Sequence, residues 1–223
     1  MGVGRGGHAG ETIRQVFSLF PVPCSLSPAF MIAGLILAAG ASSRMGRDKA
    51  LLTYRGRTFL ETIITTLREA GIERIAVVLG HHAEGIQQAV KLEGIEIVVN
   101  FEYERGQTSS LQAGLRALEQ PDLEAVVLCL VDHPAVSAAT VRKVIDSFHQ
   151  SQAPVVIPTH QGQRGHPVLI SFALFPELLA LDTGEGANTV IRKHRDATHF
   201  AAVDDPGVLL DVDDPESYRR TRT

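Results

Sequence analysis

A stretch of small residues that also carries cations is the part of the sequence best suited to chemistry on phosphates. Residues 37–49 read LAAGASSRMGRDK and follow a run of apolar residues. Small residues let the backbone approach a ligand closely, and successive N–H groups can bind phosphate oxygens. Arg44 adds a planar guanidinium for two-point phosphate contact, and Lys49 adds a compact charge. The stretch favours a nucleotide-phosphate loop, although an ordinary strand–helix turn can have this composition.

Two familiar phosphate-binding motifs are absent from this stretch. Gly40 and Gly46 are separated by five residues and lack the middle glycine of GxGxxG. The P-loop needs four residues between its glycines and then Gly-Lys-Ser/Thr, which this stretch also lacks. Gly2, Gly4 and Gly7 do have GxGxxG spacing, but no strand can precede them. A generic dinucleotide-binding module is therefore disfavoured.

An aspartate at the end of a long apolar run is the second candidate for chemistry. In an open α/β sheet Asp132 would lie at the carboxyl edge, where ligands bind, and a carboxylate there suits Mg²⁺. Asp211 and Asp213 alternate, so in an extended segment they point the same way, and one can supply a second ligand. The alternatives are a turn or capping role for Asp132 and an N-cap before Pro215 for Asp214 or Asp213.

Histidines and hydroxyls in other loops are weaker candidates. His81 and His82 follow an apolar run, and neither shows the i, i+4 spacing of a helical zinc site. A loop imidazole is more often solvated or hydrogen-bonded than catalytic. Ser109 and Ser110 begin an expected helix, where hydroxyls either cap the helix or help to bind an anion.

Short apolar runs alternate with amphipathic stretches from Met31 onwards. This order predicts βαβ units in a single domain of the α/β class, Rossmann-like and doubly wound, with helices on both faces of a mostly parallel open sheet. A small hairpin is expected around Arg55 and Gly56. We expect strands at 32–38, 75–79, 95–100, 125–131, 155–158, 167–171, 199–203 and 208–212, and helices at 60–70, 83–91, 109–118, 137–149, 176–181, 187–194 and from 215.

The composition is that of an ordinary globular protein, 44% hydrophobic and 21% charged. The formal net charge is −4 and there is no long basic run, which argues against a nucleic-acid or anionic-membrane partner. Trp is absent and aromatic residues make up 5%, so base-stacking platforms are not expected. Cys24 and Cys129 are too few for a disulfide scaffold and suit a reducing cytoplasm.

Residues 1–30 lie outside the alternating pattern. The stretch 16–41 resembles a signal peptide in its apolar run, but Pro21, Pro23 and Pro28 interrupt it, and the uninterrupted part is too short to span a bilayer. Cleavage there would also remove the first strand and the phosphate loop. We expect residues 1–30 to be a disordered extension or an upstream mis-start, and residues 31–223 to form the folded domain.

The residues of several stretches, and the order of these stretches along the chain, resemble those of the nucleotidyltransferase family. Residues 37–49 are similar to its signature loop, roughly Leu-Ala-Ala/Gly-Gly-x-Ser/Gly-x-Arg-Met-Gly followed by Lys. Residues 100–115 (NFEYERGQTSSLQAGL), 130–134 (LVDHP) and 165–169 (GHPVL) add to the resemblance. The ending LDVDDPESY is similar to Asp-x-Asp-Thr-Pro-Glu, with Asp214 in place of Thr. The chain looks most like the molybdenum cofactor cytidylyltransferases, and next like the guanylyltransferases of the same pathway.

This resemblance implies roles for individual residues. Arg44, Lys49 and Asp132 would be catalytic, Asp132 and Asp213 would hold Mg²⁺, and Gly165 and His166 would lie beside the acceptor. The residues expected to bind the nucleotide are Leu37, Ala38, Ala39, Gly40, Ser43, Arg44, Lys49 and Ser110. The donor would be CTP and the acceptor the pterin phosphate of the molybdenum cofactor. A molybdenum hydroxylase or its chaperone would be a partner.

The same residues are also compatible with other functions. GTP in place of CTP, or a sugar or polyol phosphate as acceptor, would leave the site unchanged. A chaperone that binds the finished molybdenum cofactor without turnover is a further alternative, although it has no use for Arg44, Lys49 and Asp132 together. Ala39 indicates the cytidylyl branch, because the guanylyl branch tends to carry Gly there and a methyl group takes space that a purine needs.

Overall fold

The structure is a computed structural model that describes residues 1–2, 31–42, 45–182 and 184–221. Ser43, Arg44 and nearly all of the expected N-terminal extension lie outside the described residues. Within the described part of the chain, no helix is long and apolar enough to cross a membrane.

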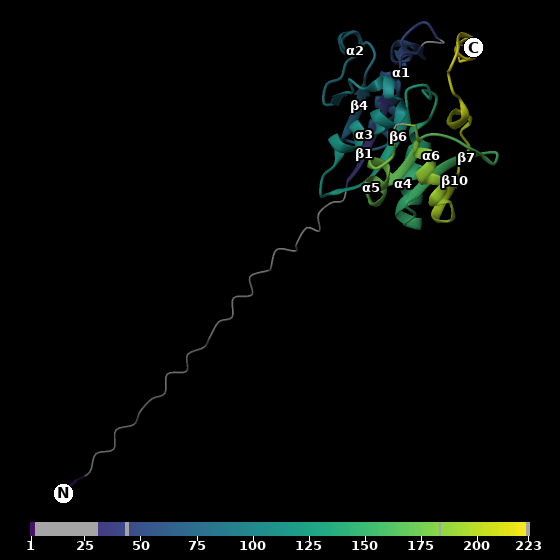
Figure 1. The fold of residues 1–223 in the computed structure, drawn as a ribbon. Helices are drawn as coiled ribbons and strands as arrows, with labels where there is room; N and C mark the ends of the chain where they lie inside the picture. The colour runs from purple at the N-terminus through teal and green to yellow at the C-terminus, as the bar shows by residue number, and fades with distance from the viewer. Residues whose placement is uncertain (3–30, 43–44, 183, 222–223) are drawn as a thin grey trace.

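A central mixed sheet forms the middle of the domain (Figure 1). Its strands are β1 (Met31–Ala38), β4 (Ile75–Leu79), β5 (Glu96–Val99), β6 (Leu123–Leu130), β7 (Val155–His160), β8 (Gln163–Arg164), β9 (Val168–Ser171) and β10 (Thr198–Ala202). They follow the order β10-β7-β9-β6-β1-β4-β5, with β8 paired to β7. β1 pairs in parallel with both β4 and β6, whereas β9 runs antiparallel to β6 and β7. The prediction of a mostly parallel open sheet is confirmed.

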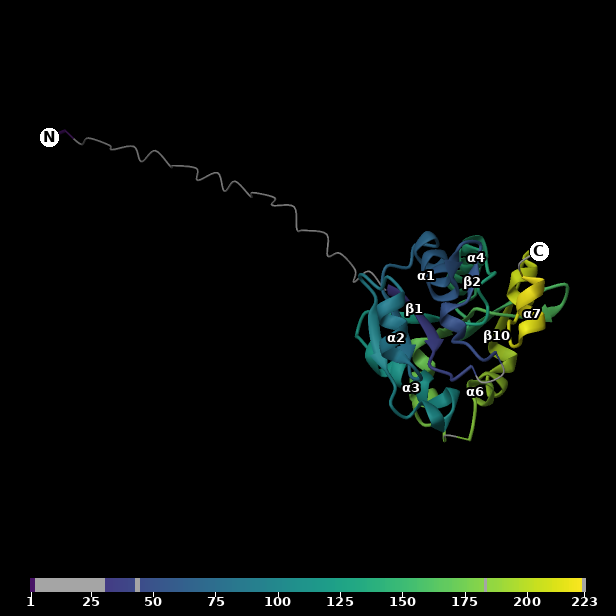
Figure 2. The ribbon, with the colours of Figure 1, turned by 90° about the horizontal axis from the view of Figure 1, so that it is seen from above.

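Helices cover both faces of this sheet. α1 (Phe59–Glu69), α2 (Ala83–Ala89) and α4 (Ala138–Ser151) share one apolar cluster, and α3 (Gln107–Leu118), α5 (Phe175–Leu179) and α6 (Ala187–Lys193) share the other. Figure 2 shows α1 and α4 on one side of β1 and α3 and α6 on the opposite side. β1 is apolar throughout because Ile36 contributes to the first cluster and Leu35 to the second.

Local sequence signals fix where these helices begin. Thr58 and Glu61 form a capping box at the start of α1, and the Ser137 hydroxyl accepts from the Thr140 N–H at the start of α4. Gly114 lets α3 pack closely on the sheet, since a Cβ there would lie 2.4 Å from Leu35. α3 therefore holds its N-terminus at a fixed place beside the end of β1.

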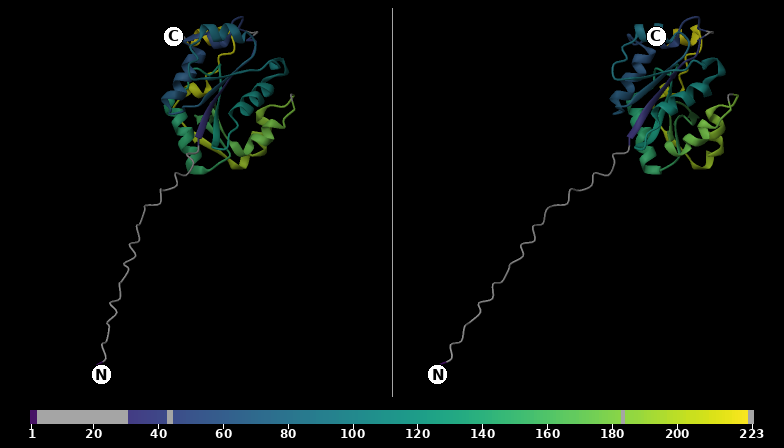
Figure 3. Two further views of the ribbon diagram at one scale, coloured as in Figure 1. Left: turned by 90° about the vertical axis from the view of Figure 1, so that its left-hand side faces the viewer. Right: turned by 60° about the vertical axis from the view of Figure 1, so that its left-hand side comes forward.

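The C-terminal segment returns to the carboxyl edge of the sheet. There α7 (Pro215–Arg220) packs against the small hairpin of β2 (Thr53–Tyr54) and β3 (Arg57–Thr58), and the Tyr218 hydroxyl donates to the Thr53 carbonyl oxygen at 3.0 Å. Figure 3 shows this yellow helix beside the blue segment that follows β1. Val212 is buried with Phe59 in a third apolar cluster.

The predicted strand at 208–212 is wrong. Pro206 instead begins a 3-10 turn (Pro206–Leu209), which Asp205 caps by accepting from the Gly207 N–H at 2.9 Å. The backbone of the following segment does not join the sheet. Its Val212 N–H donates instead to the carbonyl oxygen of Asp132, in the loop after β6, at 3.0 Å. The other predicted strands and helices are present, with ends shifted by a few residues. The remaining 3-10 turns span Lys49–Leu51, Tyr103–Arg105, Phe172–Leu174 and Arg195–Ala197.

Candidate active site

Two adjoining cavities open at the carboxyl edge of the sheet. The first, which we call the loop cavity, has a volume of about 350 Å³ and is lined by Ala39, Gly40, Lys49, Ser110 and Asp132 among others. The second, which we call the broad cavity, has a volume of about 620 Å³, and its lining includes Thr108, Arg164, His166, Asn188 and Arg192. Leu37, Gln107 and Leu130 line both cavities.

The Lys49 ammonium lies between two carboxylates that are far apart in the sequence. Its Nζ is 3.0 Å from Asp132 Oδ2 and 2.5 Å from Asp213 Oδ1. Burial of the ammonium opposes its charge, but the contacts with Asp213 and Asp132 outweigh burial and raise the pKa of Lys49. Lys49 is therefore charged at neutral pH, and it is available to a phosphate that competes with these carboxylates.

Contacts from two loops hold the backbone that carries Lys49. Its N–H donates to the Ser42 hydroxyl at 3.1 Å. The preceding residue, Asp48, places Oδ2 2.7 Å from His82 Nδ1 and Oδ1 3.6 Å from His81 Nδ1. These histidines follow β4, so they connect the loop after β1 to the neighbouring strand. His82 thus makes a hydrogen bond in a loop, the commoner of the roles weighed for it.

Asp132 follows β6 and uses its two oxygens differently. Oδ2 contacts Lys49, while Oδ1 is buried without a hydrogen-bond partner among the described residues. Asp132, His133 and Asp211 each bring one potential metal-ligand atom within 4.8 Å of the others. Burial, together with the charges of Asp132 and Asp213, raises the pKa of Asp211. A buried carboxylate oxygen without a donor is suited to a bound cation.

The aspartates before α7 have separate roles. Asp214 caps the helix, since its Oδ1 accepts from the N–H groups of Glu216 at 3.0 Å and Ser217 at 2.7 Å. Asp213 turns to Lys49 instead. Asp211 lies near Asp132, and Asp213 contacts Lys49, which also contacts Asp132. Val212 between them is buried in the third apolar cluster.

The expected nucleotide-binding residues lie mostly around the loop cavity. Leu37, Ala39 and Gly40 line it next to Lys49, whereas Ala38 packs into the apolar cluster on the α1 and α4 face. Ser43 and Arg44 are outside the described residues. Ser110 also lines the cavity, and its hydroxyl accepts from Asn100 Nδ2 at 3.0 Å.

The expected acceptor residues line the broad cavity. Gly165 must be glycine because a Cβ there would lie 2.2 Å from the Val208 carbonyl oxygen. The rings of His166 and His133 lie 4.8 Å apart between centroids. Burial, and secondarily the neighbouring His133, lowers the pKa of His166 to about 4. His166 is therefore a neutral imidazole near pH 7.

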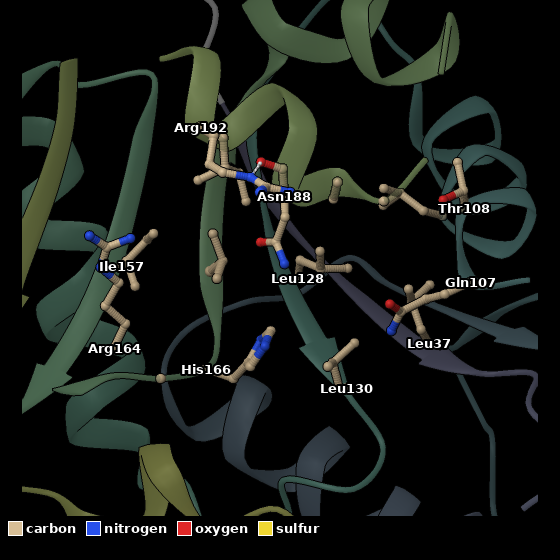
Figure 4. Close-up of a pocket in the computed structure, with 16 residues that line it drawn as sticks. Leu37, Gln107, Thr108, Leu128, Leu130, Ile157, Arg164, His166, Asn188 and Arg192 are labelled. Atoms are coloured by element: carbon tan, nitrogen blue, oxygen red, sulfur yellow. Dashed lines mark hydrogen bonds between the residues drawn. The ribbon is translucent and has the colours of Figure 1, made fainter. Parts of the chain in front are cut away.

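Several polar residues of the broad cavity were not predicted. Asn188 and Arg192 come from α6, one turn apart, and Gln107 and Thr108 come from the start of α3. Figure 4 shows Asn188 pointing into the cavity opposite His166. No local motif marks Asn188 or Arg192, since their position depends on how α6 packs against the sheet. Apolar walls with a few polar groups are typical of small-molecule sites.

Comparison with known proteins identifies the family of the chain. The family described as MobA-like NTP transferase domain matches residues 34–198. Nicotine blue oxidoreductase of Paenarthrobacter nicotinovorans is 32% identical over 201 residues, covering 85% of this chain and 95% of that protein. Molybdenum cofactor cytidylyltransferase of Escherichia coli K12 is 26% identical over 186 residues, covering 82% of this chain and 92% of that protein.

A solved structure shares most of the fold. Rv0371c of Mycobacterium tuberculosis H37Rv superposes with a TM-score of 0.78 at 35% identity, covering 86% of this chain and 97% of that one. A second structure of Rv0371c is a complex with manganese. The family match at residues 34–198 includes the loop after β1, Lys49 and Asp132. The chain belongs to the MobA-like NTP transferase family and is a nucleotidyltransferase by descent and by fold.

Proposed function

We propose that the protein transfers a cytidylyl group from CTP to a phosphorylated acceptor, the pterin phosphate of the molybdenum cofactor, and releases pyrophosphate. The observation that carries this proposal is the contact of Lys49 with both Asp132 and Asp213 beside a loop of small residues. This arrangement combines a cation for phosphates with carboxylates for a metal ion at one edge of the sheet.

The two adjoining cavities suit a reaction between two ligands. CTP would occupy the loop cavity and the acceptor the broad cavity, and the two would meet near Leu37 and Leu130, which line both. An oxygen of the acceptor phosphate attacks the α-phosphorus, a new P–O–P bond forms, and the bond between the α- and β-phosphates breaks. Catalysis of this kind rests on positioning and on neutralisation of charge.

Each residue has a defined part in this scheme. Lys49 neutralises phosphate charge, and Ser43 and Arg44 with the loop N–H groups stabilise the leaving pyrophosphate. Asp132 and Asp213 would hold Mg²⁺, which neutralises the charge of the reacting phosphates when it is bound. No residue needs to act as a base, because the acceptor phosphate is already an anion near pH 7.

The proposed acceptor also suggests a setting for the protein. A dinucleotide form of the molybdenum cofactor would pass to a molybdenum hydroxylase or to its chaperone, and we propose that this happens in the cytoplasm. Neither nucleic acid nor a membrane takes part.

A redox reaction is the second candidate, because the relative named nicotine blue oxidoreductase aligns over 95% of its length. Oxidation of NADH or NADPH by nicotine blue, followed in a spectrophotometer, tests it. Turnover in that assay without pyrophosphate release in any nucleotide assay would favour the redox candidate over nucleotidyl transfer.

Pyrophosphate release tests the proposed function. The protein is incubated with Mg²⁺, phosphorylated pterin and each of CTP, GTP, ATP and UTP in turn. We expect pyrophosphate with CTP, dependent on the pterin and absent in Asp132→Asn. Release with GTP alone would contradict the cytidylyl assignment. In a parallel series a sugar phosphate replaces the pterin, and release in that series alone would contradict the proposed acceptor.

A further inference from the structure

Asp132 presents an oxygen that the Lys49 contact does not use. Oδ2 meets Lys49, whereas Oδ1 is buried and accepts no hydrogen bond from the described residues. Leaving a buried acceptor unsatisfied is unfavourable, and it is more so for a charged group. Such an oxygen is therefore suited to a ligand that is positively charged.

The side chains around Asp132 Oδ1 are of types that bind metal ions. His133 Nε2 lies 3.9 Å away, and the potential ligand atoms of Asp132, His133 and Asp211 all lie within 4.8 Å of one another. Metal–nitrogen and metal–oxygen bonds are about 2.0–2.2 Å long, so opposed ligands of one ion lie about 4.0–4.4 Å apart. The three side chains thus need only a small rotation to reach a single ion.

The backbone holds these ligands in register. Val212 donates to the Asp132 carbonyl oxygen, and its own side chain is fully buried. Asp211 is therefore fixed next to Asp132, although the two residues are far apart in the sequence. The His133 ring is only 11% exposed and packs against His166, which lines the broad cavity.

We propose that Asp132 Oδ1, His133 and Asp211 form a second cation position, distinct from the one between Asp132 and Asp213, which takes a first-row transition ion in preference to Mg²⁺. An imidazole nitrogen is the reason for this preference, because Mg²⁺ binds oxygen ligands while transition ions accept nitrogen readily. The chain would then use the two oxygens of Asp132 for two different ions.

The second position lies toward the broad cavity, since His133 contacts His166 there. An ion at this place would face the phosphate of an acceptor, as in sites where paired ions stabilise the attacking and leaving oxygens. This placement rests on the proposed function, but the binding of the ion does not depend on which nucleotide or acceptor is used.

Mn²⁺ binding to the full chain without nucleotide tests the proposal. Free Mn²⁺ is measured by electron paramagnetic resonance in an excess of Mg²⁺, and imidazole ligation is read from the nitrogen modulation of the spin echo. We expect the wild type to retain Mn²⁺ with a nitrogen signal. His133→Gln should lose that signal, and both His133→Gln and Asp211→Asn should weaken Mn²⁺ binding at least about tenfold.

Two matched variants make the result specific. His149 Nε2 lies 3.3 Å from Glu124 Oε2 on an exposed face. His149→Gln therefore removes a histidine–carboxylate pair that is outside the site, and it should leave both Mn²⁺ affinity and the nitrogen signal unchanged. Asp213→Asn removes a ligand of the proposed Mg²⁺ position and should leave the nitrogen signal intact. Thermal unfolding in EDTA shows whether each variant is folded.

The proposal fails if wild-type Mn²⁺ shows no nitrogen signal, which is measured without any substitution. It also fails if His133→Gln binds Mn²⁺ as tightly as the wild type, or if His149→Gln abolishes the signal. A nitrogen-ligated Mn²⁺ in a protein that releases no pyrophosphate would overturn the proposed function and leave the second cation position standing.

Discussion

At the scale of single residues, the candidate site depends on Lys49 and its two carboxylate neighbours. Asp132 and Asp213 hold the Lys49 ammonium in a fixed place at the edge of the loop cavity. A phosphate bound there could replace one of the two carboxylates as its partner. The side chain of Lys49 is only 12% exposed, so its charge acts in a medium that screens it weakly.

Replacing Lys49 by methionine keeps the apolar stem and removes the charge. We expect kcat for pyrophosphate release to fall about 10²–10³-fold, the range for losing one preorganised stabilising group. The thermal midpoint should change little. Lys193→Met is the matched control, because Lys193 pairs with Glu177 on the surface and is 68% exposed. A Lys49→Met enzyme with the wild-type rate would contradict a catalytic role.

The choice of base is a second prediction at this scale. Ala39 lines the loop cavity, and in the proposed function its methyl group would take space that a purine needs. We expect CTP to be preferred over GTP by at least about tenfold in kcat/KM, because one misplaced methyl is worth about 1–3 kcal/mol. Ala39→Gly should narrow the gap by improving GTP. Competition kinetics with both nucleotides measures the ratio of the two kcat/KM values. Equal use of CTP and GTP by the wild type would contradict the assignment to CTP.

At the scale of elements, loops from distant parts of the chain are joined by a single aspartate. Asp205 accepts from the Ser137 N–H, the Ser137 and Thr140 hydroxyls, and the Gly207 N–H. Burial opposes the charge of this carboxylate, but the hydrogen bonds, led by that from Thr140, outweigh burial and lower its pKa. Asp205 thus ties the start of α4 to the 3-10 turn that leads into Asp211 and Asp213.

Asp205→Asn should lower the free energy of unfolding by about 1–3 kcal/mol, the range for hydrogen bonds to a charged group. Because the folded-state pKa lies below the ordinary value of 3.8, this stabilisation is complete above that value. It disappears as the pH falls through the folded-state pKa. Urea unfolding at a series of pH values from 7 downwards should show the free energies of unfolding of the wild type and Asp205→Asn becoming equal in acid. A constant difference at all pH values would show that the charge of Asp205 does not matter.

The element scale also shows what the sequence can and cannot predict. Periodicity predicted nearly every helix and strand, because β1 and its neighbours are apolar on both faces and Thr58 and Ser137 cap their helices. It failed at 208–212, where an apolar run follows Pro206 and the backbone bonds to loops instead of a ladder. Periodicity also carries no strand order, so the antiparallel insertion of β9 between β6 and β7 was not predicted.

The same limit applies to the candidate site. The loop motif and the position of Asp132 predicted that Lys49 and Asp132 lie at one edge, since parallel strands end there, and the family resemblance placed Asp213 in the same site; the structure brings all three together. Contacts that depend on packing were missed, among them the hydrogen bond from His82 to Asp48 and the place of Asn188 in the broad cavity. In neither case does the local sequence specify the partner.

At the scale of the whole molecule, the sheet brings two cavities together over a shared wall. The loop cavity and the broad cavity both end at Leu37 and Leu130, on the adjacent parallel strands β1 and β6. The C-terminal segment then adds Asp211 and Asp213 at the same edge. A chain of this design can hold two substrates side by side.

The start of the working domain is testable by truncation. Secondary structure in the described residues begins at Met31, and the family match begins at residue 34. A protein that starts at Met31 should keep the thermal midpoint and kcat/KM of the full chain. Starting at Leu35 instead removes half of β1 and should prevent folding. A Met31 protein that melts many degrees lower would show that residues 1–30 stabilise the fold.

The fate of each phosphate of CTP tests the central claim most directly. The protein is given Mg²⁺, phosphorylated pterin and CTP labelled at either the α- or the γ-phosphorus. Nucleotidyl transfer predicts that the α-label enters a pterin dinucleotide while the γ-label leaves as pyrophosphate, and that Asp132→Asn does neither. Transfer of the γ-label to the acceptor, or release of both labels without a dinucleotide, would contradict the account.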